Sequence, residues 1–208
     1  MGNTAEQTGP TLEIYGDYVC PYSWLLRPVL DRVLPELTIT LRRRAFELRP
    51  VPAPFPDEGF LRATWETGVV PIARTLGVEA QLPSLRPRTR KAHEAVAFAD
   101  SRGQGEAMSA AVFRAYFAEG QDIGRIDVLA RVATGVGLDY IEMRDALERD
   151  QFTEHVLEDL ERASVLGITV VPAMVLTDAA AAETTRIGWQ SADDLREWLE
   201  STLTTVME

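Results

Sequence analysis

Cysteine is nearly absent from this sequence: the 208 residues contain one, Cys20. A single cysteine cannot form a disulfide within the chain, so the sequence excludes a fold held together by internal disulfides. It also excludes a self-contained dithiol redox centre, because a second cysteine is needed there to resolve a mixed disulfide. This cysteine usage fits a reducing compartment, and we expect a cytoplasmic protein.

An excess of positive charge is also lacking. The chain has 21 Lys and Arg against 32 Asp and Glu, for a net charge of −11. Binding to nucleic acid phosphates or to an anionic membrane surface requires the opposite balance, so neither partner is expected. No run approaches the roughly 20 apolar residues of a membrane span. Residues 1–10 have no basic region followed by an apolar run, so no secretory signal is predicted.

Histidine is scarce as well, with only His93 and His155. They are far apart in the sequence, and neither has a cysteine or carboxylate at a metal-ligand spacing. We interpret both as structural or solvated side chains. We therefore expect no metal site and no tightly bound cofactor.

What the sequence does contain is a strand, helix, strand pattern near its start. Residues 11–16 alternate between apolar and polar side chains, as a half-buried strand does. Residues 22–34 have a helical period, with Pro21 near the first turn and Pro28 predicting a kink. Residues 37–46 alternate again. A helical connection between two strands favours parallel pairing in an α/β fold.

The rest of the chain is helical until strand character returns near its end. Residues 57–166 show helical periods and no convincing strand. Residues 167–176, "GITVVPAMVL", indicate a buried strand with Pro172 inside it, and "ETTRIGW" indicates its neighbour. A final amphipathic helix follows, with Ser191 as its cap.

This order of elements resembles the thioredoxin fold, with a cysteine opening the first helix and Val-Pro in the penultimate strand. The helical block resembles the insertion of the DsbA family. The segments "DYVCPYSW", "FELRP", "TRKAHEAVAFAD", "FRAYFAEGQDIGRIDVLARVATGVGLD" and "ASVLGITVVPAMVL" are similar to the FrnE-like branch of that family. The resemblance implies an α/β thioredoxin fold (βαβ…ββα) with a large all-helical insertion. We expect residues 11–56 and 167–206 to form the thioredoxin-like domain and 57–166 the inserted domain.

One position departs from the FrnE-like branch. That branch usually has Cys-Pro-x-Cys, whereas the fourth residue here is Ser23. "PYSW" also resembles kappa-class glutathione transferases and 2-hydroxychromene-2-carboxylate isomerases, which have a serine where this chain has Cys20. The sequence therefore resembles two chemistries, one based on a cysteine nucleophile and one on bound glutathione.

The candidate site residues follow from this motif. Cys20 at a helix N-terminus is surrounded by N–H donors, and the Ser23 hydroxyl one turn later can also face the sulfur. We therefore predict that Cys20 and Ser23 are catalytic and that the pKa of the Cys20 thiol lies well below about 8.5. The resemblance implies substrate contacts at Pro21 and Tyr22. It implies the same for Val171 and Pro172, with a cis peptide bond between them and the Val171 backbone facing an extended substrate.

The leading hypothesis is thiol-disulfide oxidoreductase activity through Cys20 alone, by a mixed disulfide with a protein or small-thiol substrate. Glutathione or another low-molecular-weight thiol is the expected co-substrate. One alternative is a glutathione-dependent isomerase or transferase, and another is a redox-inactive substrate-binding module. An anion-binding role for Arg42, Arg43 and Arg44 is less favoured than a solvated strand face. The sequence leaves a homodimer open.

Overall fold

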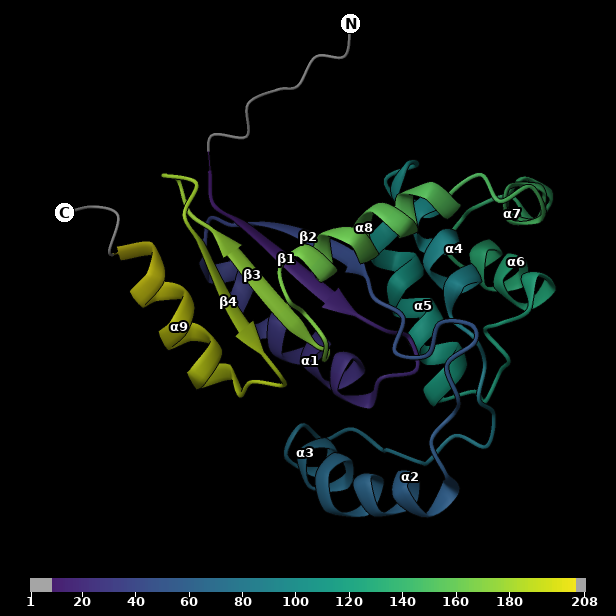
Figure 1. Cartoon of the computed structure of the whole chain (residues 1–208), viewed down its shortest axis with the longest axis horizontal. Helices are drawn as coiled ribbons and strands as arrows, with labels where there is room; N and C mark the ends of the chain where they lie inside the picture. The colour runs from purple at the N-terminus through teal and green to yellow at the C-terminus, as the bar shows by residue number, and fades with distance from the viewer. Residues whose placement is uncertain (1–8, 205–208) are drawn as a thin grey trace, which may run out of the picture.

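A four-stranded mixed sheet forms the centre of the fold, in a computed structural model that describes residues 9–204. The strands are β1 (Thr11–Gly16), β2 (Thr40–Ala45), β3 (Ala173–Thr177) and β4 (Glu183–Ile187). Their order is β2-β1-β3-β4, with β1 and β2 parallel and the other pairs antiparallel. The helix between β1 and β2 allows their parallel pairing, as predicted. Strand β2 is therefore an edge of the sheet (Figure 1).

Helix α1 (Pro21–Val33) begins directly after Cys20, and Pro21 occupies its first turn. Proline suits this position because its missing N–H would have no helical partner there. Pro28 lies inside the helix, and the predicted kink at Pro28 stays a prediction. The short 3₁₀ helix η1 (Leu34–Glu36) follows. The N–H of Leu37 donates to the carbonyl of Leu34 at 3.0 Å, so Leu37 belongs to this turn and not to a strand.

Two predicted strands therefore begin later than expected. Strand β2 starts at Thr40 instead of residue 37, because η1 and its hydrogen bond occupy the preceding turn. Strand β3 starts at Ala173, so Pro172 precedes the strand instead of lying inside it. Proline has no N–H for the ladder, which explains why pairing begins after it.

Between the two halves of the sheet the chain is helical, as predicted. The elements are α2 (Glu58–Thr64), the π-helical turn η2 (Trp65–Val69), α3 (Val70–Thr75), α4 (Arg90–Asp100), α5 (Gly105–Phe117), α6 (Ile126–Thr134), α7 (Tyr140–Glu148) and α8 (Thr153–Val165). Helices α4 to α7 gather beside the sheet around an apolar cluster that also includes Leu25 of α1 and Trp65 of η2 (Figure 1). Helix α8 instead lies along the sheet, where Ala163 packs with strand residues. The domain boundaries stay a prediction.

Each face of the sheet packs against helices. Helices α1 and α9 (Ala192–Thr204) cover one face, where Leu12, Ile14 and Met174 belong to one buried apolar cluster. Helix α8 covers the other, where Tyr15 joins a smaller cluster with Cys20. The predicted cap of α9 is present, since Ser191 Oγ accepts from the N–H of Asp194 at 3.2 Å.

Some sequence predictions fall outside the described part of the chain. Residues 1–8, which hold most of the segment used to judge a secretory signal, lie there, as do residues 205 and 206 of the predicted domain. Within residues 9–204, no helix is long and apolar enough to cross a membrane.

Candidate functional site around Cys20

Cys20 lies at the turn between β1 and α1. Its backbone N–H donates to the carbonyl of Asp17 at 3.0 Å, and its own carbonyl accepts from Trp24 at 3.1 Å, which is the first hydrogen bond of the helix. This places the sulfur at the helix N-terminus, as the motif predicted. The side chain is only 3% exposed, within an apolar cluster that includes Ile168.

The loop before β3 meets the cysteine from the other half of the fold. The Cys20 thiol donates to the carbonyl oxygen of Val171 at 3.5 Å, although the two residues are 151 positions apart. The bond between Val171 and Pro172 is cis, which confirms what the resemblance implied. The fold therefore brings together the two halves of the predicted site. The substrate-binding roles of Val171 and Pro172 stay predictions.

Ser23 lies one turn into α1 and is 8% exposed. Its hydroxyl and the backbone N–H groups of Tyr22 and Ser23 lie near the Cys20 sulfur and act to lower the pKa of the thiol. The same hydroxyl accepts a long hydrogen bond from the N–H of Asp17, at 3.4 Å. A Cβ atom at Gly16 would lie 3.2 Å from this oxygen, so glycine leaves room for the serine. Ser23 therefore lies near the thiol, and its catalytic role stays a prediction.

The predicted low pKa of Cys20 is wrong. Burial raises the pKa of the thiol above its ordinary value, and the hydrogen bonds from Ser23 and Tyr22 offset this only in part. The negative charge of Asp17 raises it further. Burial disfavours a thiolate because the apolar surroundings replace water, and the helix end cannot restore that loss. At rest the sulfur is a protonated thiol, which is consistent with its donation to Val171.

Pro21 and Tyr22 occupy the first turn of α1 beside the thiol. Tyr22 is half-buried, and burial raises the pKa of its hydroxyl. A Cβ atom added to Gly68 in η2 would fall 2.1 Å from the Tyr22 hydroxyl oxygen, so this turn approaches the tyrosine closely. Trp24 faces the helical lobe, where it stacks on Phe117 with ring centroids 4.6 Å apart.

Sequence reasoning missed a buried acid and imidazole next to this turn. Asp17 and His93 are 1% and 5% exposed, and Asp17 Oδ1 lies 3.6 Å from His93 Nε2. Asp17 Oδ2 accepts from the N–H of Leu48 at 2.7 Å, and His93 Nε2 lies 3.1 Å from the carbonyl of Phe46. The pair therefore fixes the segment after β2, whose side chains Phe46 and Leu48 pack against the Cys20 cluster. The sequence feature that could have indicated this pair is Asp17, which is the first residue of the segment "DYVCPYSW".

The three consecutive arginines of β2 are not an open anion site. Arg43 donates to Glu106 at 2.7 Å, and Arg44 bonds both Glu13 and Asp159. Carboxylates of the chain therefore already hold the guanidinium groups of Arg43 and Arg44. Among residues 9–204, no group of histidine, cysteine and acidic side chains is arranged to hold a metal ion.

Comparison with known proteins identifies the family. The sequence model of the DSBA-like thioredoxin domain matches residues 11–200. The uncharacterized protein YwbO of Bacillus subtilis (strain 168) is 32% identical over 173 residues, which cover 80% of this chain and 86% of that protein.

Solved structures share the fold over nearly the whole chain. The probable DsbA oxidoreductase SCO1869 from Streptomyces coelicolor has a TM-score of 0.75 at 25% identity, covering 92% of this chain and 89% of that one. A 2-hydroxychromene-2-carboxylate isomerase has a TM-score of 0.75 at 21% identity, with 95% and 96% covered. The cytosolic disulfide reductase DsbM from Pseudomonas aeruginosa has a TM-score of 0.71 at 20% identity, with 92% and 98% covered. This chain therefore belongs to the DSBA-like thioredoxin domain family, whose fold serves thiol-disulfide oxidoreductases and related isomerases.

Proposed function

We propose that this protein is an enzyme of thiol-disulfide exchange that uses Cys20 as its only nucleophile. The observation that carries the proposal is the position of the sulfur. It lies at the start of α1, within hydrogen-bonding reach of the Ser23 hydroxyl and 3.5 Å from the backbone of Val171. A thiolate requires hydrogen-bond donors, and an extended substrate requires a backbone segment such as that of Val171 to pair with.

The reaction proceeds through one mixed disulfide. Cys20 loses its proton, and the thiolate attacks a substrate disulfide, forming a bond to one substrate sulfur while the other leaves as a thiolate and takes up a proton. Ser23 cannot resolve this intermediate, because a hydroxyl does not replace the second thiol. An external thiol, such as glutathione, attacks the mixed disulfide as a thiolate and releases Cys20. The protein ends each cycle in its starting redox state.

Because the pKa of Cys20 is raised in the resting protein, substrate binding must help to form the reactive thiolate. In the resting protein the thiol donates to the Val171 carbonyl, and that oxygen would repel a thiolate at 3.5 Å. A substrate backbone N–H that pairs with Val171 would occupy this oxygen, as in strand addition. The sulfur would then keep only the donors of Tyr22 and Ser23, which favour the thiolate.

Intact mass after incubation with oxidised glutathione tests this proposal. We expect one glutathione per wild-type chain and none on Cys20→Ser, formed faster as the pH rises through the raised pKa and removed by reduced glutathione. The unfolded chain, in denaturant, is the control for reagent quality. If only the unfolded chain forms the adduct, at every pH and after long incubation, Cys20 is not an accessible nucleophile and the proposal is wrong.

The protonated state of Cys20 also favours a second candidate, a glutathione-dependent isomerase or transferase. A thiol that donates a hydrogen bond can orient a bound glutathione thiolate in the way a serine hydroxyl does. In that case reduced glutathione binds saturably without forming a disulfide, and Cys20→Ser retains binding and activity. The thiol-disulfide exchange proposal instead expects Cys20→Ser to lose activity and glutathione binding. Calorimetry with reduced glutathione on wild type and Cys20→Ser therefore separates the two candidate functions. If the protein is instead a binding module without redox chemistry, the Cys20→Ala variant should bind the partner as well as wild type does.

The proposal has consequences for location and partners. A single-cysteine cycle depends on a pool of small thiols, which the cytoplasm supplies, and we place the protein there. Its partners are then a thiol or disulfide substrate, with no role for nucleic acid at a net charge of −11.

A further inference from the structure

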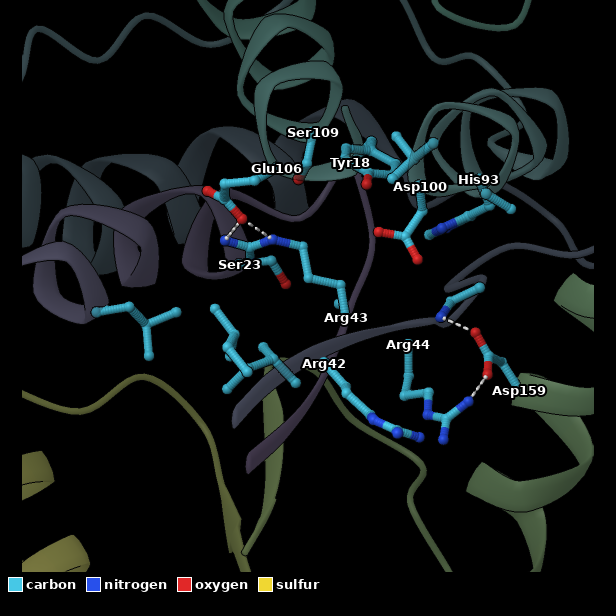
Figure 2. A pocket seen from close by; sticks show the side chains of 18 of the residues that line it. Tyr18, Ser23, Arg42, Arg43, Arg44, His93, Asp100, Glu106, Ser109 and Asp159 are labelled. Atoms are coloured by element: carbon cyan, nitrogen blue, oxygen red, sulfur yellow. Dashed lines mark hydrogen bonds and ion pairs between the residues drawn. The ribbon is translucent and has the colours of Figure 1, made fainter. Parts of the chain in front are cut away.

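The sulfur of Cys20 is not reached through the pocket next to it. This pocket has a volume of about 830 Å³ and lies beside the edge strand β2, between the strand and helices α1, α4, α5 and α8 (Figure 2). Tyr18, Ser23 and His93 line it, whereas Cys20 and Tyr22 do not. A substrate of Cys20 therefore comes to the sulfur from another side.

Four partly buried side chains pack against the apolar cluster that contains Cys20, and we call them the rim. They are Tyr22, Phe46, Leu48 and Leu166. Cys20 itself is only 3% exposed, and the other members of its cluster are buried as well. The rim is therefore the boundary between this cluster and solvent, and a substrate has to pass it to reach the sulfur.

Tyr22 is the member of the rim that is coupled to the sulfur. Burial, and to a smaller extent the charge of Cys20, raises the pKa of the Tyr22 hydroxyl, so the two groups lie close enough to interact. The Tyr22 side chain packs on the Cys20 cluster and also on the apolar cluster of the helical lobe. Within residues 9–204 its hydroxyl has no hydrogen-bond partner. Packing alone therefore positions this ring.

The π-helical turn η2 meets the outer end of the Tyr22 ring. Trp65 and Val69 of this turn are 7% and 0% exposed within the apolar cluster of the helical lobe, so the turn is firmly held. Gly68 lies between them. A Cβ atom at Gly68 would fall 2.1 Å from the Tyr22 hydroxyl oxygen and 3.4 Å from Cζ, the ring carbon that bears it. The hydroxyl therefore fills the space that a side chain at position 68 would need.

Space, and not backbone conformation, explains the glycine at position 68. Gly68 lies inside a helical turn and is not among the glycines with a positive φ. An alanine would therefore suit the backbone of η2, and the nearest atoms to its methyl group would all belong to Tyr22. Single π-helical turns are frequent at functional sites. Gly68 thus leaves a notch in η2, and the hydroxyl in this notch keeps the Tyr22 ring against the turn.

We infer that Tyr22 selects the substrates of Cys20 by their width, and that Gly68 is the positioning residue that keeps the Tyr22 ring clear of the sulfur. The favoured substrate is then a slender disulfide with little bulk next to its sulfur atoms. A disulfide inside a folded domain is excluded, because the domain cannot pass the rim. This inference rests on the proposed reaction of Cys20 and adds the substrate class to it.

Labelling of Cys20 with two maleimides of different width tests the inference. N-ethylmaleimide is slender and N-(1-pyrenyl)maleimide is broad, and both react with the thiolate. The ratio of the two labelling rates therefore cancels the fraction of thiolate and reports the width of the way to the sulfur. Relative to the unfolded chain in denaturant, we expect the folded wild type to disfavour the pyrenyl reagent by about tenfold or more.

Two substitutions assign this preference to Tyr22 and Gly68. Tyr22→Ala removes the ring, and we expect the pyrenyl reagent to gain about tenfold relative to the ethyl reagent. Gly68→Ala adds a methyl group that displaces the ring from η2 toward the Cys20 cluster, and we expect the pyrenyl reagent to lose about threefold more. Glu66→Ala changes an exposed residue of the same turn and should match wild type. Circular dichroism checks that each variant is folded.

A double substitution separates the positioning role of Gly68 from a general effect on folding. Tyr22→Phe removes the hydroxyl oxygen, so the nearest ring carbon lies 3.4 Å from an alanine Cβ at position 68, which is an ordinary contact. In the Tyr22→Phe background, Gly68→Ala should therefore change the ratio of rates by less than about twofold. A Gly68→Ala effect that persists there overturns the positioning role. An unchanged ratio in folded Tyr22→Ala protein, or no labelling of that protein at all, overturns selection by width.

Failure of this inference and failure of the proposed function give different results. Maleimide labelling needs only a thiolate that the reagent can reach, whereas the proposed function also needs a mixed disulfide with glutathione. If wild type forms the glutathione adduct and all variants keep the wild-type ratio of rates, the function stands and the inference is wrong. If the ratios change as expected and no adduct forms, the inference about width stands and the proposed reaction is wrong.

Discussion

The two faces of the sheet are filled in opposite ways. Toward α1 and α9 the strands present apolar side chains such as Leu12, Ile14 and Met174. Toward α8 the next residue of β1, Glu13, is only 4% exposed and accepts hydrogen bonds from Arg44 and Arg162. The Cys20 cluster lies on this second side as well.

This difference separates the residues that hold the fold from those that can do chemistry. An apolar face gains stability from area removed from water, with little dependence on pH. A face with buried charges gains less stability, because each charged group loses its hydration free energy on burial and must recover it through ion pairs and hydrogen bonds in the protein. It is nevertheless the face on which charge, proton position and thiol reactivity are linked. Four substitutions test this contrast, in decreasing order of expected effect.

Leu12→Ala tests the apolar face. Leu12 is fully buried, and its truncation removes apolar contacts and leaves a cavity. We expect a loss of about 2–5 kcal/mol in the free energy of unfolding. Denaturant titrations at pH 5 and pH 8 should give the same loss. A loss that changes strongly with pH would mean that this face is coupled to the ionised one.

Glu13→Gln tests the charged face. Burial alone would raise the pKa of Glu13, but hydrogen bonds from Arg162 and Arg44 lower it below its ordinary value. A lowered pKa in the folded state stabilises the protein above the unfolded value of about 4.3, and this contribution is lost as the pH falls through the folded pKa. We expect Glu13→Gln to cost about 1.5–3 kcal/mol at pH 7.

Urea titrations of both proteins between pH 7 and pH 2.5 measure this difference. Wild type and Glu13→Gln should converge in the acid range, since Glu13 is then protonated and uncharged in both states of the wild type. A constant difference over the whole range would show that Glu13 acts through packing instead of charge.

Ser23→Ala tests the thiol site on the same face. Loss of the hydroxyl removes a hydrogen bond that lowers the pKa of Cys20, so the pKa should rise further. At pH 8 we expect alkylation by iodoacetamide to slow roughly two- to tenfold, and its pH profile to move to higher pH. Ser23→Thr keeps the hydroxyl and is the matched control. Faster alkylation of a folded Ser23→Ala protein would show that access to the sulfur, not its pKa, limits the rate.

Arg149→Ala is the substitution with the smallest expected effect on stability. Arg149 and Asp145 pair at 2.9 Å on the surface of α7, with side chains 69% and 46% exposed. Solvent screens such a pair, and we expect its loss to change stability by less than about 0.5 kcal/mol. Thermal unfolding in low and high salt measures this. An effect as large as that of Glu13→Gln would remove the distinction drawn between buried and exposed charge.

Much of the fold could be predicted from the sequence, because periodicity records which side of an element is buried. Alternation in residues 11–16 indicated β1, and the helical period after Pro21 indicated α1. The starts of β2 and β3 were placed too early because the apolar pattern continues through a 3₁₀ turn in one case and through the segment before Pro172 in the other. The contact between Cys20 and Val171 was implied by the family resemblance, since no local pattern joins residues so far apart.

The state of the thiol could not be predicted in the same way. The motif shows the donors that favour a thiolate, because Tyr22 and Ser23 are neighbours of Cys20 in the sequence. It does not show the apolar side chains that bury the sulfur, such as Ala163 near the end of α8 and Ile168 in the loop after it. The pairing of His93 with Asp17 was hidden for the same reason.

Ser23 lies between the Cys20 turn and the pocket beside β2, with its hydroxyl near the Cys20 sulfur and its side chain on the wall of the pocket. A ligand in that pocket that takes a hydrogen bond from this hydroxyl withdraws it from the sulfur and makes the thiolate harder to form. Thermodynamic linkage requires the converse with equal strength: forming the thiolate must weaken the binding of that ligand. The protonation state of a single cysteine would then change the affinity of a neighbouring pocket.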